Sequence, residues 1–528
     1  MSKKILAIVL ALVMCLTLLP VTALAADKEH THDDITFKAW ASETELPNVG
    51  GNYYLTKDVT LSATWTVPAA TTTNLCLNGH VIQRSGTGSA IYVFNGATLN
   101  LYDCDARADE ADYTHAGYVD TDGLWHLGTG EGTSKNICGG VITGGNTTDD
   151  GGGLYIEIGG SVEMTGGTIS GNTADYGGGV YVYNGGRFEM SGGMISGNTA
   201  GNGGGVDVHQ GSFEMTDGTI SGNKATTGGG GVYVFTGSVE MTGGIISSNT
   251  AGFGGGVCVD RDGYFTLTGG TISGNTAQTG GGVCLVDTLT IGGTAVIKNN
   301  IDAGEKANDT ECYEDNGTIT ISADTPPASG MCVGLLGVVG DRVGNATSGD
   351  EQYFFSDNPD YYVAYNTADG GYLELKAPVA GVEYTVNISS GAGGVVYTGK
   401  QVASATSLVT LTVVPEEGYQ LKSLTVNSST DGITDKGEGK YEFTMPNANV
   451  TVTAVFEELG DEDSGCGLLR LLRAALVTKL TVCSLVRGVT AFVRLTARIA
   501  AAENATIGAA TRAAAHMAWL ANAWHLWH

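Results

Sequence analysis

Apolar and polar residues alternate in short runs along residues 151–300, and the runs recur about every 26 residues. The copies follow a common pattern that begins with Gly-Gly-Gly-Val-Tyr-Val, passes through a turn into Phe-Glu-Met-Thr-Gly-Gly-Thr-Ile-Ser, and closes on Gly-Asn-Thr-Ala, with substitutions in individual copies. Alternation with a period of two predicts strands, because a helix would need apolar residues every three or four positions. Three short strands per copy are therefore expected. The copies open at Gly151, Gly177, Gly203, Gly229, Gly254 and Gly280.

This period predicts an all-β fold, a parallel β-helix with about 25–26 residues per coil. One coil cannot cover its own apolar face, so neighbouring coils must stack about 4.8 Å apart and share backbone hydrogen bonds. Equivalent residues then form columns along the axis. The predicted inner columns pass through Val180, Val182, Phe188, Met190 and Ile195.

An asparagine recurs just after the third strand of each copy. At this position its side chain can bond the backbone of the turn or the equivalent asparagine of the next coil. We interpret the series as a structural ladder and not as a catalytic row. Its members are Asn146, Asn172, Asn198, Asn223, Asn249, Asn275 and Asn300.

A second polar series faces outward by alternation: Glu163, Glu189, Glu214 and Glu240. Like charges one strand apart repel each other unless water, salt or a cation screens them. These residues are therefore weak candidates for binding a cation such as calcium. The preferred interpretation is a solvated acidic face, because a line of carboxylates lacks the oxygen cage that calcium needs. The sequence predicts no catalytic residue, no cofactor and no dedicated metal site.

Residues 1–26 have the organisation of a secretory signal peptide. Lys3 and Lys4 precede an apolar run from Ile5 to Leu19, and small residues follow at Ala23 and Ala25. The run is short for a membrane span. We therefore expect an extracellular or cell-surface protein.

The cysteines are too dilute for a disulfide framework, since nine remain over about 500 residues once Cys15 is removed with the signal peptide. Cys258 and Cys284 occupy the same position in adjacent copies, so stacking would bring them close. They are a candidate disulfide pair, and buried free thiols are the alternative. No spacing typical of zinc or haem ligands is evident.

The repeats lie within a longer predicted solenoid. Residues 27–49 are expected to form an N-terminal cap, and residues 50–377 the β-helix, with regular repeats at 151–300 and a C-terminal cap at 301–377. An acidic insertion at about 103–136 interrupts the early coils. A separate small β domain follows at 382–457, and residues 458–528 form a basic tail rich in Ala and Leu.

Charge distinguishes the tail from the rest of the chain. The formal net charge is −29, which makes nucleic acid and anionic membranes unfavourable partners. After Ser464, however, seven residues are basic and only Glu503 is acidic. We interpret this change as a shifted reading frame, with a membrane-active tail as the alternative. Cell-wall or membrane association would then depend on a missing or altered C-terminus.

The Gly-Gly-Gly-Val-Tyr-Val start followed by Ile-Ser-Gly-Asn resembles the repeats of polymorphic outer membrane proteins and related bacterial β-helix surface proteins. The resemblance is strong over about 150 residues. It implies a right-handed solenoid with a role in adhesion or surface display and without catalytic residues. Outer membrane relatives end in a membrane β-barrel, and no C-terminal series of alternating strands builds one in this sequence.

The small β domain resembles the divergent internalin-type B repeat of Gram-positive surface proteins. The similar segments are Val409-Thr-Leu-Thr-Val-Val-Pro-Glu-Glu-Gly-Tyr419, Phe443-Thr-Met-Pro446 and Asn449-Val-Thr-Val-Thr-Ala-Val-Phe456. This resemblance implies a β-grasp-like spacer or binding module without enzymatic activity.

Together these features favour an adhesin-like surface protein that binds a host protein, a matrix protein or a glycan without catalysis. The first alternative is a polysaccharide lyase or glycoside hydrolase of the β-helix type, because the 103–136 insertion gathers carboxylates beside His115, Trp125 and His126. The second alternative is a structural spacer of the cell envelope.

Overall fold

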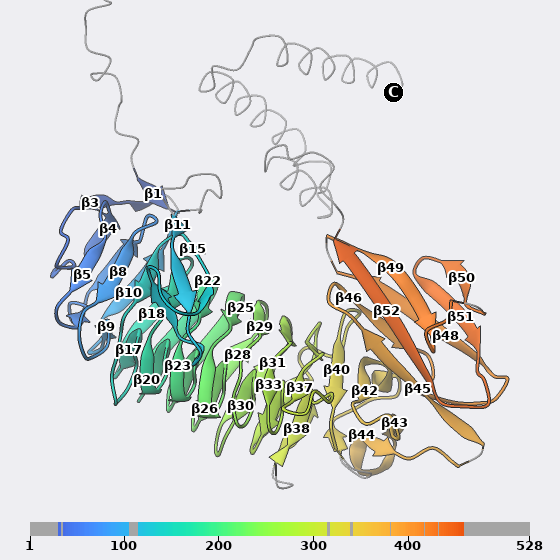
Figure 1. Cartoon of the computed structure of the whole chain (residues 1–528). Helices are drawn as coiled ribbons and strands as arrows, with labels where there is room; N and C mark the ends of the chain where they lie inside the picture. Colours follow the sequence, from blue (N-terminus) through green and yellow to red (C-terminus); the bar gives the residue numbers. More distant parts are fainter. Residues whose placement is uncertain are drawn as a thin grey trace, which may run out of the picture. The chain divides into compact units, whose positions relative to one another are not determined.

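The protein is described by a computed structural model covering residues 30–32, 35–104, 114–313, 317–337, 342–380, 382–416, 418–430 and 432–458. The described chain is almost entirely β and forms a parallel solenoid of about 11 turns followed by a small β domain. Figure 1 follows the coils from the early strands at β5 to those near β40. The predicted signal peptide and the basic tail from residue 459 onward lie outside the described residues.

Each regular coil has three sides of parallel strands, which we call the first, second and third sheets; the second and third are joined into one 23-stranded sheet. The first sheet takes the Val-Tyr-Val segment of each copy, and its strands pair in register. Its order in the described chain is β6 (Trp65–Thr66), β9 (Ile91–Val93), β17 (Leu154–Glu157), β21 (Val180–Tyr183), β24 (Val206–His209), β27 (Val232–Phe235), β30 (Val257–Val259), β34 (Val283–Leu285) and β38 (Thr310–Cys312).

The second sheet takes the Phe-Glu-Met segments. Its strands are β3 (Lys38–Trp40), β4 (Gly51–Leu55), β7 (Thr72–Cys76), β10 (Thr98–Tyr102), β18 (Ser161–Met164), β22 (Arg187–Ser196), β25 (Ser212–Ser221), β28 (Ser238–Met241), β31 (Tyr264–Leu267), β35 (Thr288–Ile291), β39 (Thr318–Ile321) and β41 (Arg342–Gly344). The antiparallel strands β44 (Tyr372–Lys376) and β43 (Tyr362–Asn366) continue it.

The third sheet takes the Thr-Ile-Ser segments. Its own strands are β5 (Val59–Leu61), β8 (Val81–Arg84), β16 (Val141–Thr143), β19 (Thr168–Ser170), β29 (Ile245–Ser247), β32 (Thr271–Ser273), β36 (Val296–Lys298), β40 (Cys332–Leu335) and β42 (Phe354–Ser356). In two coils the second and third sides merge, because β22 and β25 each run through ten residues. Glycines stand between these two segments in the sequence and would be expected to end the strand, but here a register shift between Met190 and Ser191 bends the strand without ending it.

A short extra strand follows the asparagine in several coils. The sequence pattern predicted a turn at this position. These strands are β20 (Thr173–Tyr176), β23 (Thr199–Asn202) and β26 (Lys224–Gly228), with a further pair at β33 (Thr276–Ala277) and β37 (Ile301–Asp302).

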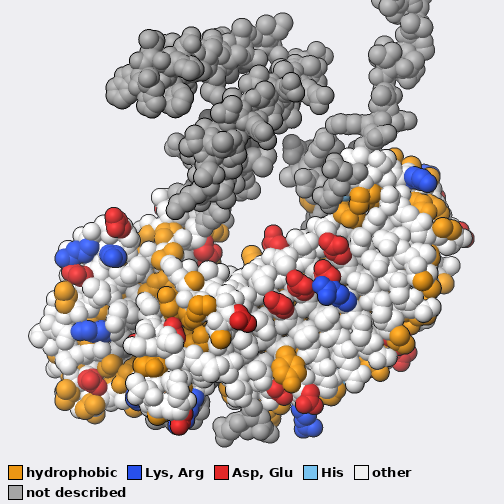
Figure 2. All heavy atoms as spheres, turned by 180° about the vertical axis from the view of Figure 1, so that it is seen from behind, with side chains coloured by type: hydrophobic (Ala, Val, Ile, Leu, Met, Phe, Trp, Pro, Cys, Tyr) orange, Lys and Arg blue, Asp and Glu red, His pale blue; other side chains and the backbone are white. Residues whose placement is uncertain are grey.

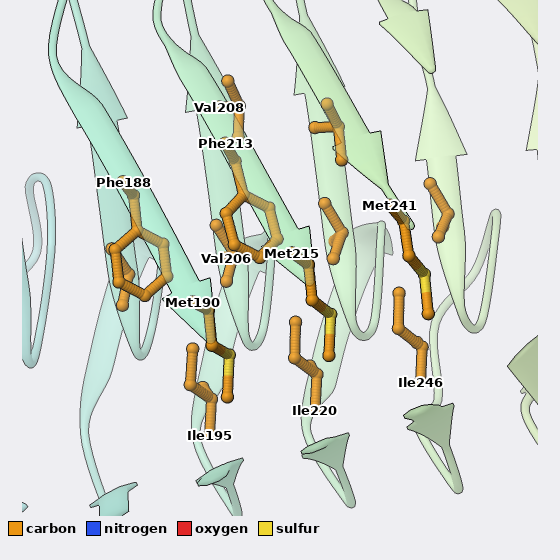
Figure 3. Close-up of a cluster of buried hydrophobic side chains, with 14 of the residues drawn as sticks. Phe188, Met190, Ile195, Val206, Val208, Phe213, Met215, Ile220, Met241 and Ile246 are labelled. Atoms are coloured by element: carbon orange, nitrogen blue, oxygen red, sulfur yellow. The ribbon is translucent and has the colours of Figure 1, made fainter. Parts of the chain in front are cut away.

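The core consists of apolar columns inside the coils. Phe188 stacks on Phe213 with ring centroids 5.0 Å apart, and both side chains are buried. Figure 3 shows the Met190 and Met215 side chains aligned from coil to coil beside the isoleucine column of Ile195 and Ile220. Each coil thus completes the apolar surface of its neighbour, which is why stacking stabilises the fold.

The glycine triplet that opens each copy is required by close contact between neighbouring backbones. A Cβ at Gly205 would lie 2.5 Å from the carbonyl oxygen of Gly231 in the next coil and 2.8 Å from Cγ2 of Ile220. Both distances are shorter than real Cβ contacts. Glycine therefore lets the coil close tightly enough to pair with its neighbour.

The two described ends of the solenoid are less regular. A hairpin of β1 (Thr31–His32) and β2 (Ile35–Thr36) precedes β3, which already pairs in parallel with β4. Near the other end lie two short 3-10 helices, η4 (Asp350–Tyr353) and η5 (Ala368–Gly370). No helix within the described ranges is long and apolar enough to cross a bilayer.

The insertion forms two small antiparallel sheets. One pairs β11 (Thr114–His115) with β15 (Ile137–Cys138), and the other joins β12 (Gly117–Val119), β13 (Trp125–Leu127) and β14 (Thr133–Ser134). Trp125 is buried against Val81, Ile137 and Val141. This side chain fixes the insertion on the coils.

The small domain has two four-stranded sheets around one apolar core. The predicted module was β-grasp-like; the described domain is all β, and its strands divide between two sheets. The first sheet contains β47 (Val402–Ser404), β45 (Glu383–Ser390), β52 (Val450–Glu458) and β49 (Tyr419–Val426). The second contains β46 (Gly394–Thr398), β48 (Leu408–Pro415), β51 (Lys440–Thr444) and β50 (Thr434–Gly437).

Candidate functional site

The asparagine series forms a continuous hydrogen-bonded ladder within the solenoid. The side-chain Nδ2 of Asn198 donates to Oδ1 of Asn223 at 3.0 Å, and the backbone N–H of Asn198 donates to the same oxygen at 3.1 Å. Six asparagines share this arrangement and are fully buried or nearly so: Asn172, Asn198, Asn223, Asn249, Asn275 and Asn300. Because their amides are committed to the ladder, these residues are structural.

Asn146 does not join the ladder. It is exposed, and Oδ1 of Asn172 instead accepts the backbone N–H of Gly145 at 2.9 Å. The early copy reads Thr-Gly-Gly-Asn where later copies read Ser-Gly-Asn, so the extra glycine displaces the asparagine by one position. The expectation that Asn146 belongs to the series was therefore wrong.

Asp309 ends the ladder. Its Oδ1 accepts hydrogen bonds from the backbone and the side-chain nitrogens of Asn300, at 2.7 and 2.8 Å. Its backbone N–H donates to Oδ2 of Asp357 at 2.7 Å. Burial raises the pKa of Asp309 to about 6, although the bonds from Asn300 act in the opposite direction. Burial, followed by repulsion from Asp309, also raises the pKa of Asp357.

We predict that replacing Asp309 with Asn makes the stability less dependent on pH. The folded state holds the Asp309 proton more tightly than the unfolded state, so stability is fully present below the ordinary pKa and is lost as the pH rises through about 6. Asn keeps an acceptor for Asn300 and carries no charge. The loss between about pH 4 and pH 7 should shrink by about 1–3 kcal/mol in urea unfolding. Asp360→Asn, at an exposed position, should keep the wild-type dependence of stability on pH. The prediction is contradicted if the wild type, Asp309→Asn and Asp360→Asn all show the same dependence.

The glutamate series lies in register as expected. Glu163 pairs with Glu189, Glu189 with Glu214, and Glu214 with Glu240. Arg187 forms ion pairs with Glu189 and Glu214. Figure 2 shows acidic side chains over the solenoid around a small basic group on one face. The row supplies one carboxylate per coil, so its oxygens do not converge on one point as the ligands of a bound cation must. Arg187 also relieves part of the repulsion between Glu189 and Glu214. The row therefore offers no enclosed cation site.

Cys258 and Cys284 lie opposite each other on β30 and β34, and both are buried free thiols. A hydrogen bond with Cys284, and then burial, raise the pKa of the Cys258 thiol. In-register parallel strands are about 4.8 Å apart, whereas a disulfide needs the Cβ atoms about 3.8 Å apart. The strand spacing therefore favours the thiol form.

The acidic insertion contributes one polar pair, Asp120 and His126, with a 2.6 Å contact between Oδ2 and Nε2. Oδ1 of Asp120 also accepts the backbone N–H groups of Asp122 and Leu124. Burial acts to raise the pKa of Asp120, but these hydrogen bonds hold it below its usual value. Asp120 thus organises a turn. Asp103, at the start of the predicted insertion, is half-buried and accepts hydrogen bonds from the backbone N–H groups of Gly79 and Gly140.

The outer side of the first sheet carries a row of aromatic rings. Tyr92 stacks on Tyr155 with centroids 4.9 Å apart, and Tyr155 contacts Tyr181 at 5.5 Å. The next outward position continues with Tyr183, His209 and Phe235, whose centroids are 5.3 and 4.7 Å apart in turn. We call these six residues the aromatic row. It passes along five coils from β9 to β27 and, apart from the buried Tyr181, its side chains are partly exposed.

Carboxylates accompany the aromatic row. The hydroxyl of Tyr92 donates to Glu157, and that of Tyr233 donates to Asp260. Burial and the bond to Glu157 raise the pKa of Tyr92 to about 12, so its hydroxyl stays protonated. Burial also lowers the pKa of His209, which keeps the ring neutral near pH 7.

Asp207 occupies the aromatic column between Tyr181 and Tyr233. It is fully buried, and neither carboxylate oxygen has a hydrogen-bond partner. Burial, with a further contribution from Asp150, raises its pKa well above the usual value. Burial therefore favours the protonated form of Asp207, and the partly exposed Glu157 is the carboxylate bonded to Tyr92 in the row.

The aromatic row is a candidate site that the repeat pattern did not bring out. Tyr181 counted only as part of the Val-Tyr-Val strand pattern, although alternation already places every such tyrosine outward. The signal was the repetition of outward rings at one position over neighbouring copies.

A family model described as divergent InlB B-repeat domain matches residues 384–460. This match confirms the resemblance stated for the small domain, and domains of this kind are typical of surface proteins. Comparison with curated proteins gave no match, and comparison with solved structures gave none.

Proposed function

We propose that this protein is exported, displayed at the cell surface, and binds an extended glycan along the aromatic row without catalysis. The observation that carries the binding role is the continuity of the row over five coils, from Tyr92 to Phe235. The B-repeat match at residues 384–460 supports surface display. We also propose that the coils are related to the repeats of polymorphic outer membrane proteins, a relationship that would fit the same role.

The chemistry of the row suits sugars. Pyranose rings present apolar C–H faces that pack on aromatic side chains, and their hydroxyls bond to carboxylates and phenols. Partly exposed rings and Glu157 supply both kinds of contact. The net charge of −29 disfavours anionic polymers, so a neutral or amino-containing glycan is the expected ligand.

A glycan array followed by affinity measurement tests this role. Tyr183→Ala/Phe235→Ala should weaken binding of the selected glycan about 10- to 100-fold, because both truncated rings lie in the row. Tyr264→Ala is the matched control, since Tyr264 is 57% exposed but lies on β31 of the second sheet. Equal affinity of the double variant and the control would contradict the proposal. Absence of any bound glycan would favour the structural spacer.

A further inference from the structure

We propose that His30, His32, Cys76 and Cys104 bind one zinc ion that fastens the N-terminal hairpin to the first coils. This Cys2His2 group is the set of His, Cys, Asp and Glu side chains within the described ranges whose ligand atoms converge, all within 4.8 Å of one another. The proposal is independent of the glycan role, because the group belongs to other strands than the aromatic row.

The local structure explains how four distant residues meet. His30 and His32 are two positions apart on extended chain at β1, so their side chains leave on the same side. Cys76 ends β7, and Cys104 follows β10 by two residues. Because β7 and β10 pair in register, the two cysteines reach the same edge of the second sheet.

The distances match the edges of a zinc tetrahedron. With Zn–S near 2.3 Å and Zn–N near 2.0 Å, such a tetrahedron has edges of about 3.8 Å between sulfurs, about 3.3 Å between nitrogens and about 3.5 Å between sulfur and nitrogen. The Sγ atoms of Cys76 and Cys104 are 3.9 Å apart, and the Nε2 atoms of His30 and His32 are 3.2 Å apart. Two of the four mixed edges are 3.2 Å, for His32 to Cys76, and 3.7 Å, for His30 to Cys104, and the other two are within 4.8 Å.

An aromatic shell encloses the four ligands. The His30 ring stacks on Tyr54 at 4.1 Å between centroids, while Phe37 and Tyr102 both lie against His32. Cys76 is fully buried, and Phe37 and Tyr102 are nearly so. A group whose four positions are all filled by protein ligands has the character of a structural zinc site, which leaves no position for substrate.

The backbone next to Cys104 is held in place by Asp103. Its two carboxylate oxygens accept the N–H groups of Gly79 and Gly140, at 2.8 and 2.6 Å. Cys104 also lies 3.3 Å from Oδ1 of Asn78, to which its thiol donates in the metal-free protein. When zinc binds, the Cys104 thiol releases this proton to solvent and its sulfur coordinates the metal instead.

Competing explanations fit the geometry less well. A Cys76–Cys104 disulfide would bring the sulfurs to about 2.05 Å and would give the two histidine nitrogens no common target. Hydrogen bonding alone leaves two imidazole nitrogens 3.2 Å apart with one proton between them. Thiolate and imidazole ligands in a tetrahedral arrangement favour zinc over calcium or magnesium.

Such a site would hold the hairpin against the side of the first coils. Tyr54, Cys76 and Tyr102 form one register column on β4, β7 and β10, and Phe37 of the hairpin region packs on this column. A metal that joins His30 to Cys104 links residues 74 positions apart and so fastens the hairpin to these strands.

The test measures how many zinc ions the purified full chain binds, by native mass spectrometry under reducing conditions. Absorption spectroscopy of the cobalt-substituted protein is the second readout. The wild type should bind one zinc, and cobalt should give the charge-transfer bands of thiolate ligands. Cys104→Ser and His30→Gln should each weaken zinc binding about 100-fold or more. Cys138→Ser is the control, because Cys138 is exposed and outside the group, and it should bind as the wild type does.

Cysteine alkylation of the wild type keeps the proposal testable even if a variant fails to fold. Zinc should protect Cys76 and Cys104 from alkylation and leave the exposed Cys138 reactive. The proposal is overturned if the reduced wild type takes up no stoichiometric zinc, or if Cys104→Ser binds zinc as tightly as Cys138→Ser. The zinc proposal is also overturned if protein collected after export by its native host contains a Cys76–Cys104 disulfide.

Discussion

Replacing Asn223 with Ala should destabilise the solenoid by about 3–5 kcal/mol, as expected when several buried polar groups lose their partners together. Oδ1 of Asn223 accepts two hydrogen bonds from Asn198, and its Nδ2 donates to the carbonyl of Ile195 and to Asn249. Alanine leaves the Asn198 donors and the Ile195 carbonyl inside the protein without these bonds. The thermal and urea midpoints should both fall clearly.

Asn146→Ala is the matched control. Asn146 is the same residue type at the corresponding place in an earlier copy, but it is exposed and outside the ladder. Its replacement should change stability by no more than about 0.5 kcal/mol. If the two variants unfold at the same midpoint, the buried ladder does not stabilise the coils.

Much of the architecture followed from the sequence because one physical constraint repeats. Period-two alternation assigned Val206 and Val208 to the interior and left Glu214 outside, and stacking in register then fixed the columns. Where a single residue was inserted, as beside Gly145, the same reasoning misplaced Asn146 by one position.

Other features depended on contacts between segments that no local pattern records. Trp125 was assigned to a polar cluster, yet its indole is buried against Val81 and Val141 from the coils. His30, Cys76 and Cys104 show none of the paired spacing of zinc motifs, because stacking of the coils brings them together rather than a local loop. The asparagine ladder was visible because its members share one sequence period.

The aromatic row illustrates an intermediate case. Outward tyrosines at one position of successive copies were present in the repeat itself, but their mutual stacking and the burial of Asp207 depend on side-chain packing. Sequence alone could place the rings on one face; it could not separate the partly exposed rings from those that neighbouring strands cover.

Deleting half a coil should unfold the solenoid, whereas deleting a whole coil should not. Removal of residues 203–228 takes out β24, β25 and β26 together and joins Asn202 to Gly229, which opens the next copy. Asn198 can then bond Asn249 in place of Asn223. Removal of residues 203–215 instead takes out the first and second sides of this coil and leaves the third side, so the columns on either side of the gap no longer match.

Circular dichroism with thermal unfolding of these two deletions tests most directly whether the coils stack in register. Stacking in register predicts a native strand signal and a midpoint within a few degrees of the wild type for the whole-coil deletion, and loss of cooperative unfolding for the half-coil deletion. If the whole-coil deletion is as disrupted as the half-coil deletion, one repeat is not one layer of the solenoid, and the coils do not stack in register.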